Sequence, residues 1–571
     1  MKELVTFQVG SYANFIGSHF WNFQDELLGL FEDPQADMVF KNQNLDMDVL
    51  YRTGETQQGI PTYTPRLISV DFQGSLGSMS SHGTLYNQSS SLSSSITTWN
   101  GNVSTQASEP YKKNLFLQRL YDEGKEKVAN ANGDSQSEIQ DTDVVNSLEE
   151  SVEFWTDYSK VHYHPQSLFE LNGSWVNPQE FNNYGIGKNT LSEGLQGDEI
   201  NERFRFFIEE CDHVQGIQFI IDDSGGFSGV GASILENIAD DYTNVPVVLY
   251  SVRSPSSFIN PKTRKQNIYS NLHDAVSFSA LSSLCNLIIP VGLPSLNESR
   301  FSQFLNLQDN KLYHSSGVYA SVIHSVSLPF RMKRIGPNGE SLYECGAMDL
   351  YEGIQMLAGQ GRQNYVAVLD ACIPAPSLVG RVFKQSLLEN LLPLTPETAY
   401  DVEDLQAIES VIVQGVLGSE EHEATLSEVK EAMETAYEKA TTRPRFSHLS
   451  VSRCPLPILL PFPSIFGTRV GRRGEILSNP VSESESMSRR GSIDVHSIPM
   501  AARLRSSTAI LPFLENRLGN IRKFGLERGS IGAEVLRNWG FGREEVEEIG
   551  ENLSKLVVTL DPHQGYSSDS D

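Results

Sequence analysis

Strands and helices alternate between about residues 203 and 292, and this alternation limits the possible folds more than any other feature of the sequence. Three short apolar runs mark it: IQFII from Ile217, VPVVLYSV from Val245 and LIIPV from Leu287. Continuous apolar runs of this length are typical of strands that are buried on both faces of a sheet. Because helical patterns separate them, the sequence predicts an α/β fold with a doubly wound parallel sheet.

The N-terminus shows a strand, a tight turn and a helix. The run LVTFQV from Leu4 predicts the strand, and Gly10 follows it. Apolar residues then recur at helical spacing, at Ile16, Phe20 and Phe23. Many α/β nucleotide-binding folds begin in this way, so the pattern favours a Rossmann-like nucleotide-binding domain.

A glycine-rich turn, DDSGGFSGVG from Asp222 to Gly231, lies where a strand ends and a helix begins. Glycines at such a turn let backbone N–H groups approach an anion closely, and the helix N-terminus adds positive potential. The turn is therefore a candidate phosphate cradle, formed by Gly225, Gly226, Gly229 and Gly231. The same pattern is also typical of a tight strand-to-helix connection that binds nothing, and the sequence leaves both interpretations open.

The chain is acidic, because its 571 residues contain 44 Lys and Arg against 72 Asp and Glu, a formal net charge of −28. Affinity for nucleic acid depends largely on Lys and Arg, so we expect no direct nucleic-acid ligand and no unspecific docking on anionic lipid. Only a local basic patch would escape this argument. Five scattered cysteines without a CxxC pair favour a reducing compartment and argue against structural zinc.

No apolar run approaches the roughly 20 residues that a membrane helix needs. Lys2 is the only Lys or Arg among the first 30 residues, whereas a cleaved mitochondrial presequence is rich in Arg. We therefore predict a cytoplasmic protein without a transmembrane segment, whose association with any organelle is peripheral.

Changes in composition along the chain predict four parts. Residues 1–330 form the nucleotide-binding type of domain, with a Ser-rich disordered insertion at about 74–150. Residues 331–475 form a divergent second α+β domain with acidic helices. Residues 476–500 form a disordered linker, in which Arg489-Arg490-Gly491-Ser492 has the pattern of a phosphorylation site. Residues 501–571 form a C-terminal helical region with an acidic tail.

Three segments resemble tubulins in the expected order. QVGSYANFIG from Gln8 is similar to the tubulin sequence QAGQCGNQIG, and CDHVQG from Cys211 is similar to CTGLQG. GGFSGVG from Gly225 is similar to the tubulin signature GGGTGSG. The chain is identified as a member of the Misato family of tubulin-like proteins on the segments Val5–Glu26, His162–Leu168, Glu209–Phe219, Gly226–Ala232 and Gln266–Tyr269.

This resemblance implies a tubulin-like fold over residues 1–70 and 150–330. It implies a cytoplasmic protein, partly peripheral at the mitochondrial outer membrane, that supports mitochondrial distribution, morphology and genome inheritance. The implied partners are proteins at the mitochondrial surface, tubulin or its chaperonin machinery. The implied cofactor is GTP or GDP with Mg²⁺, and the residues that would contact it are Gly10, Ser11, Tyr12, Gly225, Gly226, Ser228, Gly229, Gly231 and, at the base, Asn267.

Departures from the tubulin pattern argue against catalysis. Tyr12 adds bulk where a nucleotide would lie, and Phe227 replaces a glycine of the signature. The stretch Val318–Arg331, which corresponds to the tubulin loop that supplies a catalytic acid, contains no Asp or Glu. Asp222 and Asp223 would repel a triphosphate unless Mg²⁺ intervenes, or else cap the turn.

Two functions therefore remain. The favoured one is a non-motor scaffold or regulator of mitochondrial organisation that acts through protein partners, with weak or vestigial guanine-nucleotide binding and no catalytic residue. The alternative is an active GTP-binding, self-assembling tubulin-like GTPase that acts in cytoskeleton or spindle organisation.

Overall fold

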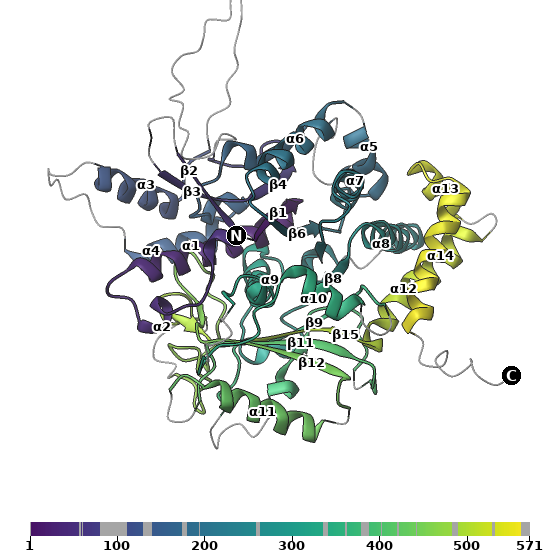
Figure 1. Ribbon diagram of the computed structural model, residues 1–571. Helices are drawn as coiled ribbons and strands as arrows, with labels where there is room; N and C mark the ends of the chain where they lie inside the picture. The colour runs from purple at the N-terminus through teal and green to yellow at the C-terminus, as the bar shows by residue number, and fades with distance from the viewer. Residues whose placement is uncertain are drawn as a thin grey trace, which may run out of the picture.

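The computed structural model arranges the chain as two β-sheets with helices packed on and between them (Figure 1). Within the residues that the structure describes, no helix is both long and apolar enough to cross a membrane. The described residues are 2–55, 59, 61–79, 111–128, 140–173, 180–192, 194–258, 263–334, 341–359, 363–378, 387–400, 402–418, 422–440, 442–481, 489–527 and 531–560.

The first sheet contains six parallel strands in the order β5–β4–β1–β6–β7–β8. From β1 the chain proceeds outward through β4 to β5, and it then returns to β6 and proceeds the other way to β8. The direction of winding therefore reverses between β1 and β6, which confirms the predicted doubly wound sheet. The strands are β1 (Glu3–Val9), β4 (Leu67–Phe72), β5 (Leu168–Leu171), β6 (Val214–Asp222), β7 (Val247–Val252) and β8 (Leu287–Val291).

Helices cover both faces of this sheet, because successive residues of a strand point to opposite sides. In β6, Ile220 belongs to the apolar cluster that includes α1 (Ser11–Glu32) and α9 (Leu312–Ser327). Its neighbours Phe219 and Ile221 belong to a second cluster on the other face. The helices of that second cluster are α6 (Gln196–Glu209), α7 (Phe227–Asp241) and α8 (Arg264–Ser283).

Parts of the predicted insertion at 74–150 are helical. Helices α3 (Leu115–Val128) and α4 (Asp141–Ser151) lie within it, and α4 buries Val144 and Leu148. The prediction of disorder is therefore wrong for these two helices, whose apolar residues are too few for the composition to reveal them. Residues 80–110 and 129–139, which include most of the Ser-rich stretch, lie outside the described residues.

The second sheet is mixed and has five strands in the order β10–β9–β15–β11–β12. Strand β12 is parallel to β11, whereas the other neighbours are antiparallel. Helix α11 (Leu426–Lys439) packs on one face of this sheet through Val429 and Met433. The strands are β9 (Val368–Cys372), β10 (Leu392–Pro393), β11 (Ile408–Gln414), β12 (Phe446–Ser452) and β15 (Met500–Ser506).

Helix α9 joins the two sheets. It lies between α1 and strands β11 and β15, and every residue from Tyr313 to Ser327 is buried (Figure 1). The sheets also meet at an edge, where the backbone N–H of Ile288 in β8 donates to Tyr365 O at 2.9 Å. The two halves consequently share one interior.

The linker predicted at 476–500 is wrong for residues 489–500. Arg490 forms a β-bridge with Phe466, and Val495 and Ile498 are buried. Ser492, predicted to lie in a disordered loop, is only 6% exposed. A few apolar residues within polar sequence are sufficient to anchor this segment against a preformed core, and composition does not detect them. Residues 482–488 lie outside the described residues.

The predicted C-terminal helices are confirmed. Helices α12 (Leu511–Asn520), α13 (Ile531–Asn538) and α14 (Arg543–Leu560) pack against α8 on the outside of the first sheet (Figure 1). Residues of the acidic tail, 561–571, lie outside the described part of the chain.

Smaller elements complete the fold. They are the hairpin β2 (Tyr51–Glu55) and β3 (Pro61–Pro65), the pair β13 (Leu456–Pro457) and β14 (Ser497–Ile498), and helices α2 (Met38–Lys41), α5 (Tyr184–Ser192) and α10 (Leu350–Ile354). Single 3-10 turns are η1 (Met47–Val49), η2 (Trp155–Tyr158), η3 (Pro165–Ser167), η5 (Pro255–Ser257), η6 (Arg300–Gln303), η7 (Leu328–Phe330), η9 (Leu387–Asn390) and η11 (Thr508–Ile510), and π-helical turns are η8 (Gln355–Gly359) and η12 (Ile521–Leu526).

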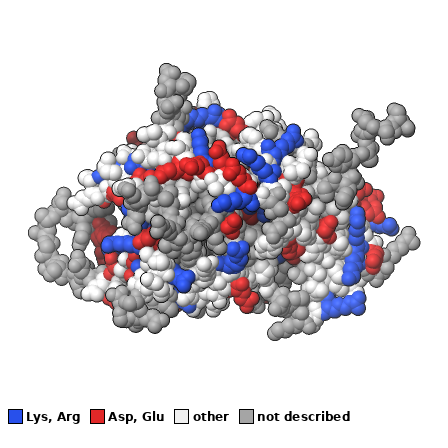
Figure 2. All heavy atoms as spheres, turned by 90° about the horizontal axis from the view of Figure 1, so that it is seen from below, with Lys and Arg blue, Asp and Glu red and all other residues white. Residues whose placement is uncertain are grey.

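Charges of both signs are interspersed on the face seen from below, on the side of α11 (Figure 2). Lys and Arg side chains lie beside Asp and Glu there and do not form one continuous basic field. The described residues of this face therefore form no extended basic surface of the kind that binds a nucleic-acid backbone.

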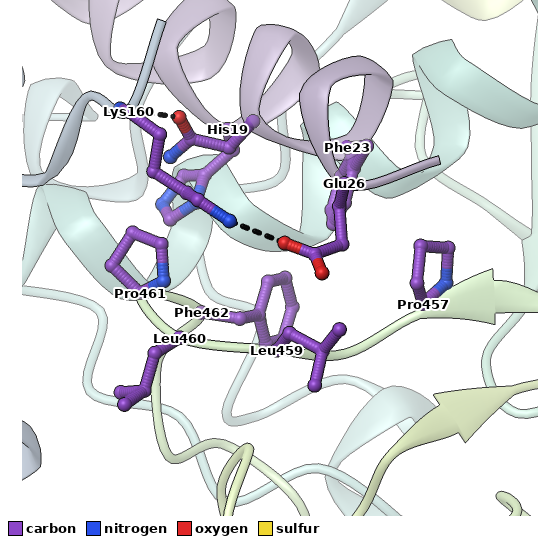
Figure 3. Close-up of a pocket in the computed structure, with 10 residues that line it drawn as sticks. His19, Phe23, Glu26, Lys160, Pro457, Leu459, Leu460, Pro461 and Phe462 are labelled. Atoms are coloured by element: carbon purple, nitrogen blue, oxygen red, sulfur yellow. Dashed lines mark hydrogen bonds and ion pairs between the residues drawn. The ribbon is translucent and has the colours of Figure 1, made fainter. Parts of the chain in front are cut away.

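The segment of residues 457–462, which lies between the two halves, packs directly on α1 (Figure 3). The Phe462 ring lies 5.7 Å from the Phe23 ring, and the Lys160 ammonium pairs with Glu26 beside them. The backbone N–H of Lys160 donates to Asn22 Oδ1 at 2.9 Å. The space enclosed here is about 10 Å³, which is room for a single water molecule, so this is a packing contact.

Candidate functional site

The carboxyl ends of β1 and β6 form the switch point of the first sheet, where open α/β sheets commonly bind ligands. The structure brings the two predicted loops together there, since the backbone N–H of Tyr12 donates to Asp222 Oδ2 at 3.4 Å. Gly10 has a φ of +103°, and a Cβ on it would lie 2.7 Å from Asp222 Cβ and 2.9 Å from the Phe227 ring. Only glycine suits this position, both for its backbone angle and for space.

Three phenylalanine rings fill the switch-point crevice. Phe72 ends β4, Phe181 precedes α5, and Phe227 begins α7. The Phe227 ring centroid lies 4.7 Å from that of Phe72 and 5.1 Å from that of Phe181. Phe227 is only 5% exposed, and its ring lies against Gly10. The space above the end of β1 is therefore occupied by the protein itself.

The glycines of the second loop are explained by close packing. The Gly226 N–H donates to Phe181 O at 3.0 Å, and a Cβ on Gly226 would lie 2.5 Å from the Phe181 ring. A Cβ on Gly225 would lie 2.7 Å from Phe181 O, and one on Gly229 would lie 2.2 Å from Tyr184 O. Gly231 similarly leaves room for the side chain of Ile221 in β6. Of the two interpretations of this turn, a tight connection explains all four glycines without a ligand.

The hydroxyl groups predicted to face a nucleotide have partners within the protein. Ser11 Oγ donates to Asp71 Oδ1 at 2.7 Å, and Tyr12 Oη donates to Ser315 Oγ at 2.8 Å. Ser228 is fully buried and donates to Gly225 O at 2.8 Å. These groups stabilise the loops and the contact with α9.

Two buried carboxyl groups lie at the N-terminus of α1. Asp71 accepts hydrogen bonds from the Ser11 hydroxyl, from the Asn14 side chain at 3.1 Å and from the backbone N–H of Phe72. Asp222 accepts from the backbone N–H of Ser224 at 3.0 Å, as the capping interpretation predicts. Burial raises the pKa of Asp71 to about 6 and also raises the pKa of Asp222. The position that a helix N-terminus offers to an anion is thus taken by the protein's own carboxyl groups.

Sequence reasoning missed Asp71, although its place at the end of a buried strand was a usable signal. It also missed Phe181, which no local pattern connects to the second loop.

The carboxylate of Asp223 is fully paired. It forms an ion pair with Arg253 at 2.7 Å and accepts from Ser251 Oγ at 2.6 Å.

Asn267 is not brought to the loops. It is exposed in the first turn of α8, where its Oδ1 accepts from Asn271 Nδ2 at 3.2 Å. Helix α8 contacts the second loop six residues later, through His273 Nε2, which lies 2.9 Å from Asp223 O. Among the contacts of the described residues, none joins Asn267 to either loop.

The stretch that corresponds by resemblance to the acid-bearing tubulin loop is mostly a helix. Residues Val318–Ser327 lie in α9, and η7 follows. Arg331 is fully buried, donates to the carbonyl groups of His324 and Ser327 and so caps the end of α9. A buried helix between two sheets cannot present a catalytic group to a neighbouring molecule. The assignment of this stretch as a loop is therefore wrong.

Two family comparisons agree with this architecture. Residues 2–122 match the family described as "Misato Segment II tubulin-like domain", and residues 145–332 match the family described as "Tubulin domain". The second match ends just beyond α9.

Curated relatives match over most of the chain. Protein misato homolog 1 of Homo sapiens is 30% identical over 426 residues, which cover 70% of each chain. Protein misato homolog 1 of Mus musculus is 26% identical over 590 residues, and Protein misato of Drosophila melanogaster is 25% identical over 590 residues. Both of these alignments cover 97% of each chain.

Proposed function

The chain belongs to the Misato family of tubulin-like proteins, and on this premise we propose that it is a non-motor scaffold or regulator of mitochondrial organisation. It supports the distribution, morphology and genome inheritance of mitochondria. It acts from the cytoplasm, partly as a peripheral protein at the mitochondrial outer membrane. Its partners are proteins, with tubulin or its chaperonin machinery as candidates, and its guanine-nucleotide binding is weak or vestigial.

The observation that carries the proposal is the filled switch-point crevice. Phe227 lies against Gly10, where a nucleotide phosphate would need the backbone of the first loop to be open. Opening the crevice would expose the half-buried Phe72 and the buried Phe181 and Phe227, and the latter two each contribute roughly 1.5–3 kcal/mol by being buried. A nucleotide would have to supply that free energy before it gained any net affinity.

The charges at the crevice add to this cost. The carboxyl groups of Asp71 and Asp222 lie at the N-terminus of α1, so a triphosphate would meet negative charge at that position. Mg²⁺ would be needed to compensate for this repulsion, and even with Mg²⁺, which takes only one or two protein carboxylates when it is bound through nucleotide phosphates, the ring of Phe227 still lies where the phosphates would need room. The residues present therefore suit GTP or GDP with Mg²⁺ poorly.

Nucleotide content tests the vestigial part of the proposal. The full chain is purified without added nucleotide, and bound guanine nucleotide and Mg²⁺-dependent GTP turnover are measured. We expect no bound nucleotide and no thermal shift with millimolar GTP. Stoichiometric bound GTP that is lost in Gly229→Val would contradict this and favour the self-assembling GTPase. The control is Gly29→Val, because Gly29 is exposed in α1, has open space around its Cα and has no positive φ.

Cell fractionation and depletion test the mitochondrial part. We expect a share of the protein to sediment with mitochondria and to be released by carbonate, as peripheral proteins are. Depletion should disturb mitochondrial distribution, and re-expression of the wild type should restore it. A fully soluble protein together with normal mitochondria after depletion would refute this part.

A further inference from the structure

The chain between β13 and β14 contains a basic cluster, although the protein as a whole is acidic. Residues 464–481 and 489–496, which we call the arginine module, contain five arginines and two acidic residues, a formal charge of +3 in a chain of −28. The arginines are Arg469, Arg472, Arg473, Arg489 and Arg490, and the acids are Glu475 and Asp494. A local basic patch of this kind escapes the argument from net charge.

A hairpin turn presents two of these arginines to solvent. The backbone N–H of Gly471 donates to Glu475 O at 2.8 Å, and that of Gly474 donates to Gly471 O at 3.1 Å. Gly474 has a φ of +77°, which suits a glycine at the end of a short hairpin loop. Arg472 and Arg473 therefore form the tip of the hairpin, and both residues are exposed.

The hairpin is fixed to the second part of the module. The backbone N–H of His496 donates to Arg472 O at 2.8 Å. The guanidinium group of Arg490 donates to Val470 O and, at 3.3 Å, to Asp494 O. Because Arg490 is used to hold the backbone together, the exposed arginines are positioned before any ligand arrives, and binding them costs less conformational entropy.

The acidic residues of the module leave its arginines unpaired. The Glu475 carboxylate accepts from the backbone N–H of Arg473 at 2.8 Å. None of the five arginines forms an ion pair with any residue that the structure describes. Residues 482–488, which include Glu483 and Glu485, lie outside the described part of the chain, and counting these two glutamates still leaves a formal charge of +1.

The elements packed against the module do not cancel its charge. Residues 304–306, which pair with Phe466 and Gly467, are uncharged. Glu149 of α4 accepts from the backbone N–H of Ser464 at the base of the module, but its carboxylate is already paired with a histidine and a lysine near the start of α9. The charge that the module offers to a ligand is therefore positive.

Exposed apolar side chains lie among the arginines. Ile493 is 43% exposed and Val481 is 36% exposed. The backbone N–H of Val481 donates to Thr468 O at 3.0 Å, which places Val481 beside Arg469 in the paired backbone, and Ile493 lies in the turn that Arg490 holds. An anionic membrane accepts both kinds of side chain, since arginines meet lipid phosphates while apolar groups enter the headgroup boundary. A purely charged partner would leave the apolar groups in water.

We propose that the arginine module is the contact of this protein with an anionic phospholipid membrane. Arg469, Arg472 and Arg473 bind lipid phosphates, and Val481 and Ile493 enter the headgroup boundary. The inference rests on the proposed peripheral association with the mitochondrial outer membrane, and it names what the protein binds there. Because the chain is acidic overall, the membrane repels other orientations, so the contact is weak, oriented and sensitive to salt.

Sedimentation of the full chain with lipid vesicles tests the proposal. Vesicles of phosphatidylcholine with about 30% phosphatidylserine are compared with vesicles of phosphatidylcholine alone, at about 0.1 M NaCl. We expect binding to the anionic vesicles that is lost at about 0.5 M NaCl, and no binding to the neutral ones. No binding to the anionic vesicles at the lower salt concentration, or equal binding to both kinds, would overturn the proposal.

Variants locate the contact. Arg472→Ala/Arg473→Ala should lower the partition coefficient roughly 30-fold, because each arginine near an anionic surface contributes about a factor of five. Ile493→Ser should lower it roughly 3- to 10-fold. Arg264→Ala/Lys265→Ala is the matched control, because it removes the same charge from two neighbouring exposed cations in the first turn of α8. An equal loss of binding in this control would contradict the proposal. All the changed residues are exposed, and urea unfolding verifies that each variant is folded.

A polyglutamate peptide serves as the rival partner. If the peptide binds, Arg472→Ala/Arg473→Ala weakens its binding and Ile493→Ser weakens neither peptide nor vesicle binding, the module is a site for an acidic protein segment and the lipid contact is refuted. Loss of vesicle binding in Ile493→Ser supports the lipid contact.

Fractionation separates this inference from the proposed function. A wild-type protein that sediments with mitochondria but does not bind the anionic vesicles would overturn the inference and leave the proposed function standing. A wild-type protein that binds the vesicles through the module but does not sediment with mitochondria would support the inference and refute the mitochondrial association.

Discussion

At the scale of single residues, one substitution relative to the tubulin-like signature has the largest consequence. Phe227 occupies the position of a signature glycine, and its ring covers Gly10 instead of leaving the first loop open. The fold accommodates a phenylalanine at this position, because Phe72 and Phe181 pack against its ring. The same loop that could hold a phosphate as a chain of glycines has thus become part of a hydrophobic core.

Gly10 and Gly29 give opposite predictions for the same substitution. Gly10→Ala should destabilise the protein by roughly 2–4 kcal/mol, because φ is positive and the new methyl group would meet Asp222 and Phe227. Gly29→Ala should stabilise it by about 0.5–1 kcal/mol, since Gly29 is exposed within α1 and has open space around it. Equilibrium unfolding in urea measures both. A Gly10→Ala change as mild as Gly29→Ala would show that the crevice is not tightly packed.

His19 should make stability depend on pH. Its ring lies between α1 and the segment around Phe462 (Figure 3), and its Nε2 is 3.1 Å from Tyr313 O. Burial lowers the pKa of His19 to about 3, so the folded protein holds this ring neutral while the unfolded chain protonates it below pH 6.5. The stability it contributes is complete above pH 6.5 and is lost as the pH falls toward 3, by up to about 1.4 kcal/mol per pH unit.

The difference between the wild type and His19→Gln isolates this effect from other groups. The variant keeps a side-chain N–H for Tyr313 O and should show a shallower loss of unfolding free energy between pH 6.5 and 4. His422→Gln is the control, because His422 lies at the surface. Equal slopes in the wild type and His19→Gln would mean that the ring is accessible to water.

At the scale of elements, α4 shows how a helix with little apolar surface is held in place. It buries only Val144 and Leu148, but Glu149 reaches across to α9. Glu149 Oε2 lies 2.7 Å from His314 Nε2, and Oε1 accepts from the backbone N–H of Ser464 at 2.8 Å. One carboxylate therefore connects α4, α9 and the segment that follows β13.

Removing this charge should loosen α4. Burial opposes ionisation of Glu149, but His314, Ser464 and Lys311 together lower its pKa to about 2, so the carboxylate is ionised at neutral pH. Glu149→Gln should cost roughly 1–3 kcal/mol of unfolding free energy and should speed amide hydrogen exchange in residues 141–151. The neighbouring exposed Glu150→Gln should change neither by more than about 0.5 kcal/mol. Identical exchange in both variants would contradict the anchoring role.

At the scale of the whole molecule, the central helix makes the two sheets one unit. The first sheet and α9 match the "Tubulin domain" region that ends at residue 332, but α9 also packs on β11 and β15 of the second sheet. Its surface is apolar or buried polar on all sides, since every residue from Tyr313 to Ser327 is buried. If one of the elements that cover such a helix is removed, side chains that are normally buried become exposed to water.

A fragment of residues 1–330 should therefore not fold by itself, although the sequence predicts it as a domain. It would expose the second-sheet side of α9 and also lose the cover that α12 and α14 provide for α8. We expect aggregation or a poorly dispersed NMR spectrum, whereas the full chain should unfold in one transition by both fluorescence and circular dichroism. A stable, well-dispersed fragment would show that the halves are independent.

The sequence by itself determined the parallel sheet, the place of both loops at its carboxyl edge and the family. Strand burial and helix periodicity are local properties, and Gly10 and Gly225–Gly231 follow their strands directly, so alternation alone was sufficient to place them. The sequence did not determine whether the space between the loops is open or filled by side chains. Phe72, Phe181 and Phe227 are far apart along the chain and meet only because β4 ends, and α5 and α7 begin, at the same edge of the sheet. Whether that edge is an open site or a packed core depends on side chains from separate segments, and only the tertiary structure brings them together.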